Sequence, residues 1–147
     1  NRLEKNNIGL FFCWGVKYGL AEDNVIDGNV TGLSIGHRDT DNLIRRNTIT
    51  NSTQVGILFR PERGPSFCAH RNVIEDNVVT NSGGPQGVAI DVQGGTESVT
   101  IRRNQLKETR AADQRVGIRL GADTKDMQLA ENEIVGFAQG VVQMPRA

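Results

Sequence analysis

The chain has 147 residues, and 17 Lys and Arg balance 17 Asp and Glu, so its formal net charge is zero. This balance disfavours a nucleic-acid partner, because proteins that bind phosphates normally present a basic face. Hydrophobic residues make up 37% of the chain, enough for a folded core, and no apolar run is long enough to cross a bilayer. We expect one domain over residues 1–147, and because the pattern is already under way at Asn1, without an initiating Met, we expect a fragment of a longer protein.

Two short sequence motifs, called phrases below, recur along the chain. The first is an Asn followed by any residue and then an aliphatic one, and its copies begin at Asn1, Asn24, Asn47, Asn77, Asn104 and Asn132. The second is a Gly with aliphatic or aromatic residues one and three places later, and its copies begin at Gly9, Gly32, Gly56, Gly87, Gly117 and Gly140. The five steps from Gly9 to Gly140 average about 26 residues, which indicates a repeat architecture.

Each phrase predicts a short, half-buried strand, because apolar and polar residues alternate over a few positions. A third short strand precedes most of the Asn positions, as at residues 43–44, 99–101 and 127–129. Three short strands cannot close a core alone, so neighbouring repeats must stack. The sequence therefore predicts an all-β fold, a single-stranded right-handed parallel β-helix (solenoid) of about five to six coils, with the handedness taken from parallel crossovers.

Stacking places equivalent residues of successive coils above one another, about 4.8 Å apart. We expect an asparagine ladder, in which each side-chain amide bonds to the next coil, of Asn24, Asn47, Asn77, Asn104 and Asn132. We expect one interior column of Leu10, Leu33, Ile57, Val88, Ile118 and Val141, and a second of Phe12, Ile35, Phe59, Ile90 and Leu120. The same alignment predicts an ion pair between Arg60 and Asp91. Cys13 and Cys68 fall two coils apart, beyond the reach of a disulfide unless the loop of residues 61–71 folds back.

Residues 42–52 and 72–82 look like repeats of the right-handed parallel β-helix family, within the pectate-lyase-like superfamily. The resemblance covers nearly the whole chain and implies an extracytoplasmic location and an outer groove that binds polysaccharides. It does not extend to the motifs of characterised enzymes, since the epimerase and polygalacturonase patterns are absent. We also expect the rest of the parent chain to stack on the ends of the β-helix.

A polar strip with aromatic edges is predicted where the turns of adjacent coils meet. Its members are Trp14, Lys17, Tyr18, His37, Arg38, Asp39, Asp41, Arg60, Glu62, Arg63, Asp91 and Arg119. Taken singly, each fits a solvated turn, an ion pair or a cover on the core. Their convergence on neighbouring coils favours a site. Trp14 and Tyr18 offer faces for sugar rings, and the charged groups offer partners for hydroxyls.

Several chemistries remain open for this strip. A lyase needs a base, for which Lys17, His37 or Arg60 are candidates, and Arg38 or Arg119 as a cationic clamp. A glycoside hydrolase needs two carboxylates, which Glu62 can form with either Asp91 or Asp39. Ca²⁺ is a further option, held by Asp39, Glu62 and Asp91.

The leading hypothesis is thus a polysaccharide- or oligosaccharide-binding or -processing domain, with Lys17, His37, Arg60 and Asp91 as the candidate catalytic residues. The alternative is a non-catalytic structural or adhesion module of a secreted or surface protein. A short distance between two carboxylates, or between a base and a carboxylate, favours catalysis. Scattering of these side chains over different faces favours the module.

Overall fold

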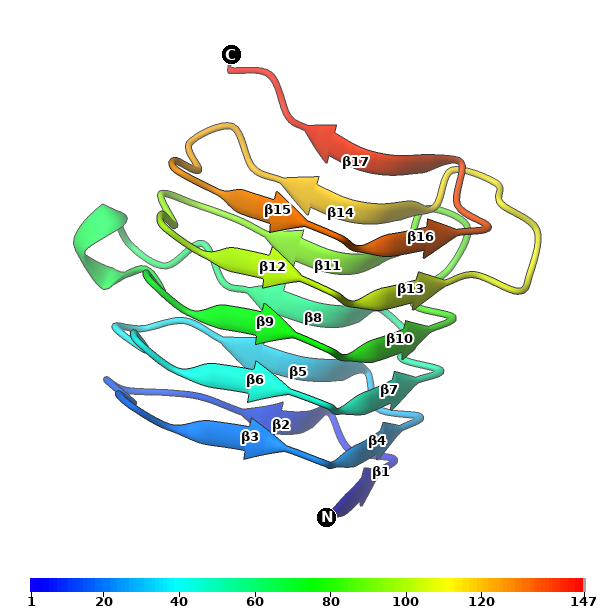
Figure 1. Cartoon of the computed structure of the whole chain (residues 1–147), viewed down its shortest axis with the longest axis horizontal. Helices are drawn as coiled ribbons and strands as arrows, with labels where there is room; N and C mark the ends of the chain where they lie inside the picture. Colours follow the sequence, from blue (N-terminus) through cyan, green and yellow to red (C-terminus); the bar gives the residue numbers. More distant parts are fainter. Residues whose placement is uncertain (147) are drawn as a thin grey trace.

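The computed structural model describes residues 1–146, which wind into stacked coils (Figure 1). Each full coil gives one strand to each of three parallel sheets. The first sheet contains β1 (Arg2–Glu4), β4 (Val25–Asp27), β7 (Thr48–Thr50), β10 (Val78–Thr80), β13 (Gln105–Lys107) and β16 (Glu133–Val135). The second contains β2 (Ile8–Phe11), β5 (Thr31–Ile35), β8 (Val55–Phe59), β11 (Val88–Val92), β14 (Val116–Leu120) and β17 (Gln139–Gln143). The third contains β3 (Leu20–Glu22), β6 (Leu43–Arg45), β9 (Val73–Glu75), β12 (Thr100–Arg102) and β15 (Gln128–Ala130).

This architecture confirms the predicted right-handed parallel β-helix, with about five turns. We number the coils by their strands, so that coil 1 holds β1 to β3 and coil 5 holds β13 to β15. Within the described residues the helical structure is limited to one 3-10 turn, η1 (Pro65–Phe67). None of the described helices is long and apolar enough to cross a membrane.

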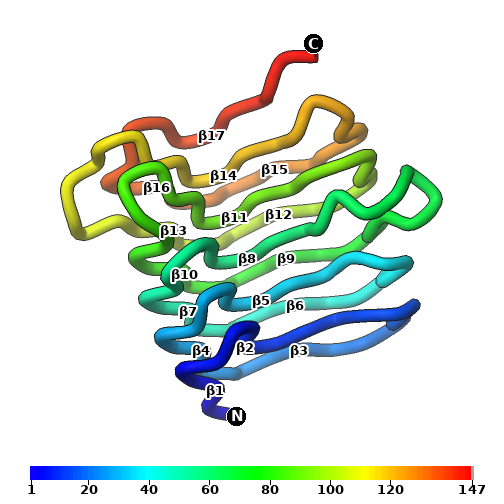
Figure 2. The backbone as a smooth tube through the Cα atoms, turned by 180° about the vertical axis from the view of Figure 1, so that it is seen from behind, coloured from blue at the N-terminus to red at the C-terminus, as the bar shows by residue number. Residues whose placement is uncertain are grey.

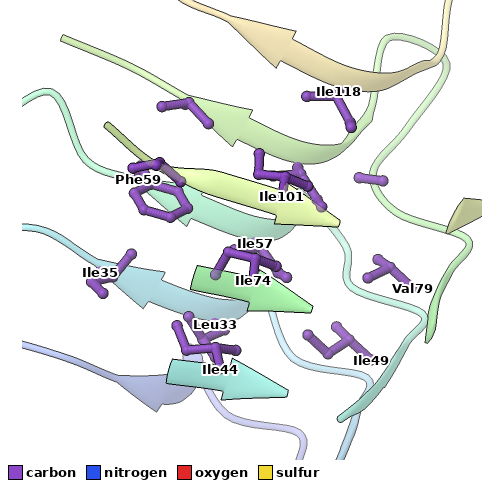
Figure 3. Close-up of a cluster of buried hydrophobic side chains, with 14 of the residues drawn as sticks. Leu33, Ile35, Ile44, Ile49, Ile57, Phe59, Ile74, Val79, Ile101 and Ile118 are labelled. Carbon is purple, nitrogen blue, oxygen red and sulfur yellow. The ribbon is translucent and has the colours of Figure 1, made fainter. Parts of the chain in front are cut away.

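Stacked aliphatic side chains fill the space between the three sheets (Figure 3). Leu33 and Ile57 come from the second sheet, Ile44 and Ile74 from the third, and Val79 from the first; all five are fully buried. Because coils 2 to 4 each bury an inward aliphatic residue of every strand, the core continues along the solenoid axis. The burial of this apolar surface is the main source of stability for coils that have no core of their own.

The asparagine ladder is confirmed and marks the turn from the third sheet to the first, which we call the Asn corner. The Nδ2 group of each Asn donates to the Oδ1 atom of the next, over 2.9–3.0 Å, in the series Asn24, Asn47, Asn77, Asn104 and Asn132. Asn1 extends the series at its start, donating to Asn24 over 3.0 Å. The residue before each Asn from Asn24 onward has a positive φ of 52–58°, as for Arg46 and Asp76, so the same bend recurs at every coil.

The predicted interior columns are wrong at coil 4, where the register is shifted by two residues. Ile90 lies beside Ile57, and Val92 lies beside Phe59, so Ile90 takes the place expected for Val88, and Val92 the place expected for Ile90. The cause is the turn that precedes β11. There the N–H of Gly87 donates to the Gly84 carbonyl over 2.8 Å, which leaves Gly87 in a tight turn. Ala89 therefore occupies the place that a glycine takes in the other coils.

Two longer connections protrude from opposite sides of the stack (Figures 1 and 2). One follows β8 and carries η1, and the other joins β13 to β14. The first lies where the chain passes from the second sheet to the third. We call this edge of the solenoid the Trp14 corner; it comprises the turns of residues 12–19, 36–42, 60–72, 93–99 and 121–127.

Candidate functional site

The Trp14 corner brings together most of the predicted strip. Trp14, Lys17 and Tyr18 lie in the turn of coil 1, His37, Arg38 and Asp39 in that of coil 2, and Arg60 and Glu62 in that of coil 3. Coil stacking places these turns side by side, as the sequence predicted. The insertion after β8 then folds over the turns of the neighbouring coils, because Arg38 donates its backbone N–H to the Phe67 carbonyl over 2.9 Å.

Asp39 is a buried structural carboxylate. Its side chain has no exposed surface and accepts the backbone N–H of Val16 at 2.8 Å and of Gly36 at 3.0 Å. The Arg60 guanidinium lies 3.6 Å from its second oxygen. A buried carboxylate must be satisfied in this way to remain charged, and these bonds tie the turns of coils 1 and 2 together.

Arg60 reaches back across two coils. Its guanidinium donates to Ser34 Oγ at 2.7 Å and to the Phe12 carbonyl at 3.0 Å, and it lies 4.8 Å from the centroid of the Phe11 ring. The side chain runs past Gly36, where an added Cβ would lie 2.6 Å from the Arg60 Nε atom. Gly36 is thus required by the close approach of the Arg60 side chain. Because these donors already bond to the protein, the Arg60 guanidinium is not free to act as the catalytic base of a lyase.

Glu62 links the turns of coils 2 and 3. One oxygen accepts the His37 N–H at 2.8 Å and the Arg60 Nε–H at 3.0 Å, while the other lies 3.6 Å from His37 Nδ1. Burial alone would raise the pKa of Glu62, but these hydrogen bonds and the charge of Arg60 outweigh it and hold the pKa below its ordinary value of 4.5. Glu62 is therefore an ionised anchor for the turn.

Aromatic rings from three successive coils form a stack along the Trp14 corner. The centroids of Trp14 and His37 are 4.3 Å apart, and those of His37 and Phe67 are 5.4 Å apart. Trp14 is 77% exposed, and Tyr18, in the same turn, is 84% exposed. These values leave ring faces available to a ligand on an otherwise polar surface.

Beyond η1 the same corner is hollowed into a cleft. Its volume is about 410 Å³, and its walls come from the inserted loop and from the turns of coils 4 and 5. Glu62, Glu97 and Lys125 give the cleft both signs of charge. The aromatic stack and the cleft together extend along the axis from coil 1 to coil 5.

The predicted pair of Arg60 and Asp91 is wrong, because the register shift moves Asp91 out of the turn. Asp91 lies in β11 beside Leu58 and Arg119, and it accepts both Arg119 Nε at 3.1 Å and Arg119 Nη2 at 2.7 Å. Its second oxygen also accepts the amide of Gln93 at 2.8 Å. Asp91 and Arg119 therefore form a separate, satisfied pair on the outer face of the second sheet.

The observed geometry does not supply the calcium set or an open pair of carboxylates. Asp39 and Glu62 both contact Arg60, whereas Asp91 contacts Arg119. No group of three or more His, Cys, Asp or Glu side chains that could hold a metal ion occurs in residues 1–146. Among the predicted bases, His37 faces Glu62 and two aromatic rings, and Lys17 lies in the exposed turn of coil 1.

Comparison with known proteins supplies the family. Residues 1–143 match the profile of the family described as "Periplasmic copper-binding protein (NosD)". The chain belongs to the NosD family. The family is periplasmic, which confirms the predicted extracytoplasmic location. Neither a search of curated proteins nor a search of solved structures found a match.

Residues 1–146 of this NosD-family chain do not offer a set of side chains that fits a copper ion. Copper prefers thiolate, thioether and imidazole ligands, yet the two cysteines are separate and the Cys68 thiol is buried against the carbonyls of Pro61 and Gly64. Burial raises the pKa of the Cys68 thiol and disfavours the thiolate that binds metals. His70 is also committed, since Nδ1 accepts the Glu97 N–H at 3.1 Å and Nε2 bonds to the Pro65 carbonyl at 2.6 Å.

Two residues of the corner were assigned no role from the sequence. Phe67 continues the aromatic stack, and Arg63 lies over its ring. The sequence placed Arg63 in the strip without a role, whereas Phe67 lies deeper in the insertion after β8, which has no counterpart in other coils, so the repeat pattern gave no position for it. The signal available was the insertion itself, since loops that interrupt a solenoid often shape its binding side.

Proposed function

We propose that this NosD-family chain is a non-catalytic β-helix domain that binds a polysaccharide along the Trp14 corner. The observation that carries the proposal is a contrast within the corner. The rings of Trp14 and Tyr18 are exposed, whereas Asp39, Arg60 and Glu62 are bonded to one another and to the backbone. Sugar rings stack on exposed aromatic faces, whereas a catalytic acid or base must be free to exchange a proton.

The shape of the corner supports a long ligand. The exposed rings lie on coil 1 and the cleft lies on coils 3 to 5, with the half-buried His37 and Phe67 rings between them. Glu97 and Lys125 in the cleft offer hydrogen-bond partners for hydroxyl groups. A glycan that runs parallel to the solenoid axis would contact both, and it would gain affinity from several weak contacts rather than from one deep pocket.

The test is binding of the purified protein to a panel of neutral and acidic polysaccharides. We expect Trp14→Ala and Tyr18→Ala each to weaken binding about tenfold, because each removes a stacking surface. The matched control is Leu20→Ala. Leu20 is an exposed apolar residue of the same coil, but it lies in β3 and not in the turn of the Trp14 corner. We expect this control to bind as the wild type does.

Two results would contradict the proposal. If no polysaccharide binds, or if the Trp14 and Tyr18 variants bind normally, the chain is better described as a structural or adhesion module. If mass spectrometry finds ligand fragments that have lost or gained the mass of water, the domain is a lyase or a hydrolase. Fragments that have lost water would make Lys17 the first residue to replace, and fragments that have gained water would make Asp39 and Glu62 the first.

A further inference from the structure

Two arginines differ from all others in the described chain. Of the 13 arginines, 11 form ion pairs with carboxylates: Arg2, Arg45, Arg46, Arg60, Arg71, Arg102, Arg103, Arg110, Arg115, Arg119 and Arg146. Within residues 1–146, Arg38 and Arg63 have no such partner. In a protein with no net charge, this leaves two guanidinium groups whose charges are not locally balanced.

These two arginines meet at one aromatic ring. The guanidinium carbon of Arg38 lies 4.3 Å from the centroid of Phe67, and that of Arg63 lies 4.6 Å from it. They come from different coils, since Arg38 follows β5 and Arg63 belongs to the insertion after β8. A guanidinium over an aromatic ring is attracted to the ring by its charge, and this contact uses none of its N–H donors as hydrogen bonds to a carboxylate.

The surrounding loop fixes this arrangement. Arg38 donates its backbone N–H to the Phe67 carbonyl at 2.9 Å, and His70 joins the Pro65 carbonyl to the Glu97 N–H in the next turn. The nearby carboxylate of Glu62 is already bonded to Arg60 and to the His37 N–H. The loop thus holds the Phe67 ring beside the Arg38 backbone, and the nearest carboxylate is already engaged elsewhere. Because the loop backbone is already anchored, the entropic cost of ordering it on binding is lowered.

From this geometry we infer that Arg38 and Arg63, held on Phe67, form an oxyanion-binding site of the Trp14 corner. The inference rests on the proposed function and narrows it to an acidic glycan, whose carboxylate or sulfate groups would accept charge-assisted hydrogen bonds from both guanidinium groups. The Trp14 and Tyr18 rings would contact the sugars, and the two arginines would select for their charge. Arg38 was predicted as a ligand contact from the sequence; the pairing with Arg63 comes from the structure.

The test compares three probes of matched length: polygalacturonate, dextran sulfate and uncharged dextran. We expect wild-type protein to bind at least one acidic probe, and the affinity to fall as salt is added. Arg38→Gln and Arg63→Gln should each weaken this binding about tenfold, and the double variant about a hundredfold. The control is the double variant Lys5→Gln and Lys107→Gln, which removes two exposed positive charges far from Phe67 and should bind as the wild type does.

The outcomes separate this inference from the proposed function. Dextran binding as tight as that of the acidic probes would overturn the oxyanion site and leave glycan binding intact. An NMR titration could show that inorganic sulfate binds at Arg38 and Arg63 while no polysaccharide binds. That result would support the oxyanion site and overturn the proposed function. Equal losses in the lysine control would show that only net charge matters, and no binding by any probe would overturn both.

Discussion

The Asn corner and the Trp14 corner are edges of the same solenoid, but they repeat in different ways. At the Asn corner every coil places an Asn at the same position, and the two preceding residues alternate in charge from coil to coil, from Glu22 and Asp23 to Arg45 and Arg46. Arg46 bonds to Glu22 at 2.7 Å and to Asp23 at 3.0 Å. At the Trp14 corner the turns of coils 2, 4 and 5 have the same length but different sequences, and the third coil carries an insertion whose Phe67 carbonyl accepts the backbone N–H of Arg38.

The difference separates a surface that fixes the register from one that is free to acquire a ligand. A polar residue that repeats in every coil, such as the Asn of the ladder, forms hydrogen bonds with its equivalents in the coils above and below, so its polar atoms are not available to a ligand. A residue that occurs once, such as Trp14 or Arg63, has no equivalent partner in the next coil and remains available to another molecule. Departures from the repeat are therefore the best guide to function in this chain.

The largest expected effect tests the Asn corner. Asn77 is fully buried and makes four side-chain hydrogen bonds, to Asn47, Asn104 and the Ile44 carbonyl. We expect Asn77→Ala to lower the free energy of unfolding by about 4 kcal/mol, because buried partners are left unsatisfied. Urea denaturation measures this. Asn6→Ala is the control, since the Asn6 side chain is exposed and makes no hydrogen bond within the described residues.

A somewhat smaller effect is expected from the buried charges of the Trp14 corner. Arg60→Ala leaves the Asp39 carboxylate buried without its cation, and we expect a loss of about 3 kcal/mol in the same assay. The control is Arg46→Gln, which removes an exposed arginine of the Asn corner and should leave the denaturation midpoint almost unchanged. If both arginines mattered equally, the distinction between buried and exposed ion pairs in the two corners would fail.

Acid should weaken the Trp14 corner through Glu62. Its pKa is lower in the folded state than in the unfolded chain, so its contribution is complete above about pH 4.5 and is lost as the pH falls through the lowered value. We expect the wild type to lose more stability than Glu62→Gln between pH 6 and about pH 3. Parallel curves for the two proteins, measured by thermal unfolding at each pH, would show that Glu62 is not responsible.

The smallest expected effect concerns copper. Because the cysteines are separate and both nitrogens of His70 are bonded, we expect no shift in the unfolding temperature when Cu⁺ is added under reducing conditions. Cys68→Ser should behave as the wild type does. A stoichiometric shift that is absent from Cys68→Ser would contradict this expectation and would show that the thiol leaves its contacts in the inserted loop to bind the metal.

Most of the fold could be predicted because the repeat reports it several times over. The asparagine ladder was predicted from six copies of one phrase. It forms because coils stacked at strand spacing place the amides of equivalent Asn residues within hydrogen-bond distance. The failure at coil 4 has an equally local cause. Gly87 fits the glycine phrase, but it is used in a tight turn with Gly84, so Ala89 takes its place and Asp91 joins Arg119 instead of Arg60.

The candidate site was predictable in its location and less so in its chemistry. The sequence placed Trp14, His37 and Glu62 in neighbouring turns, and the structure brings these turns together. It could not show that Glu62 and Asp39 share Arg60, because a side chain that reaches across two coils leaves no trace in the spacing of residues. The roles assigned to Lys17, Tyr18 and Arg38 remain predictions for the binding experiments.

The sequence by itself determined the parallel β-helix, its asparagine ladder and its interior outside coil 4, because each follows from contacts between equivalent residues of adjacent coils and a repeat encodes such contacts many times. Only the tertiary structure decided the register of coil 4, the pairing of Asp91 with Arg119, and the meeting of Arg38 and Arg63 on Phe67. These contacts occur once each. They depend on the tight turn before β11 and on the path of the insertion after β8, which patterns of polarity do not specify.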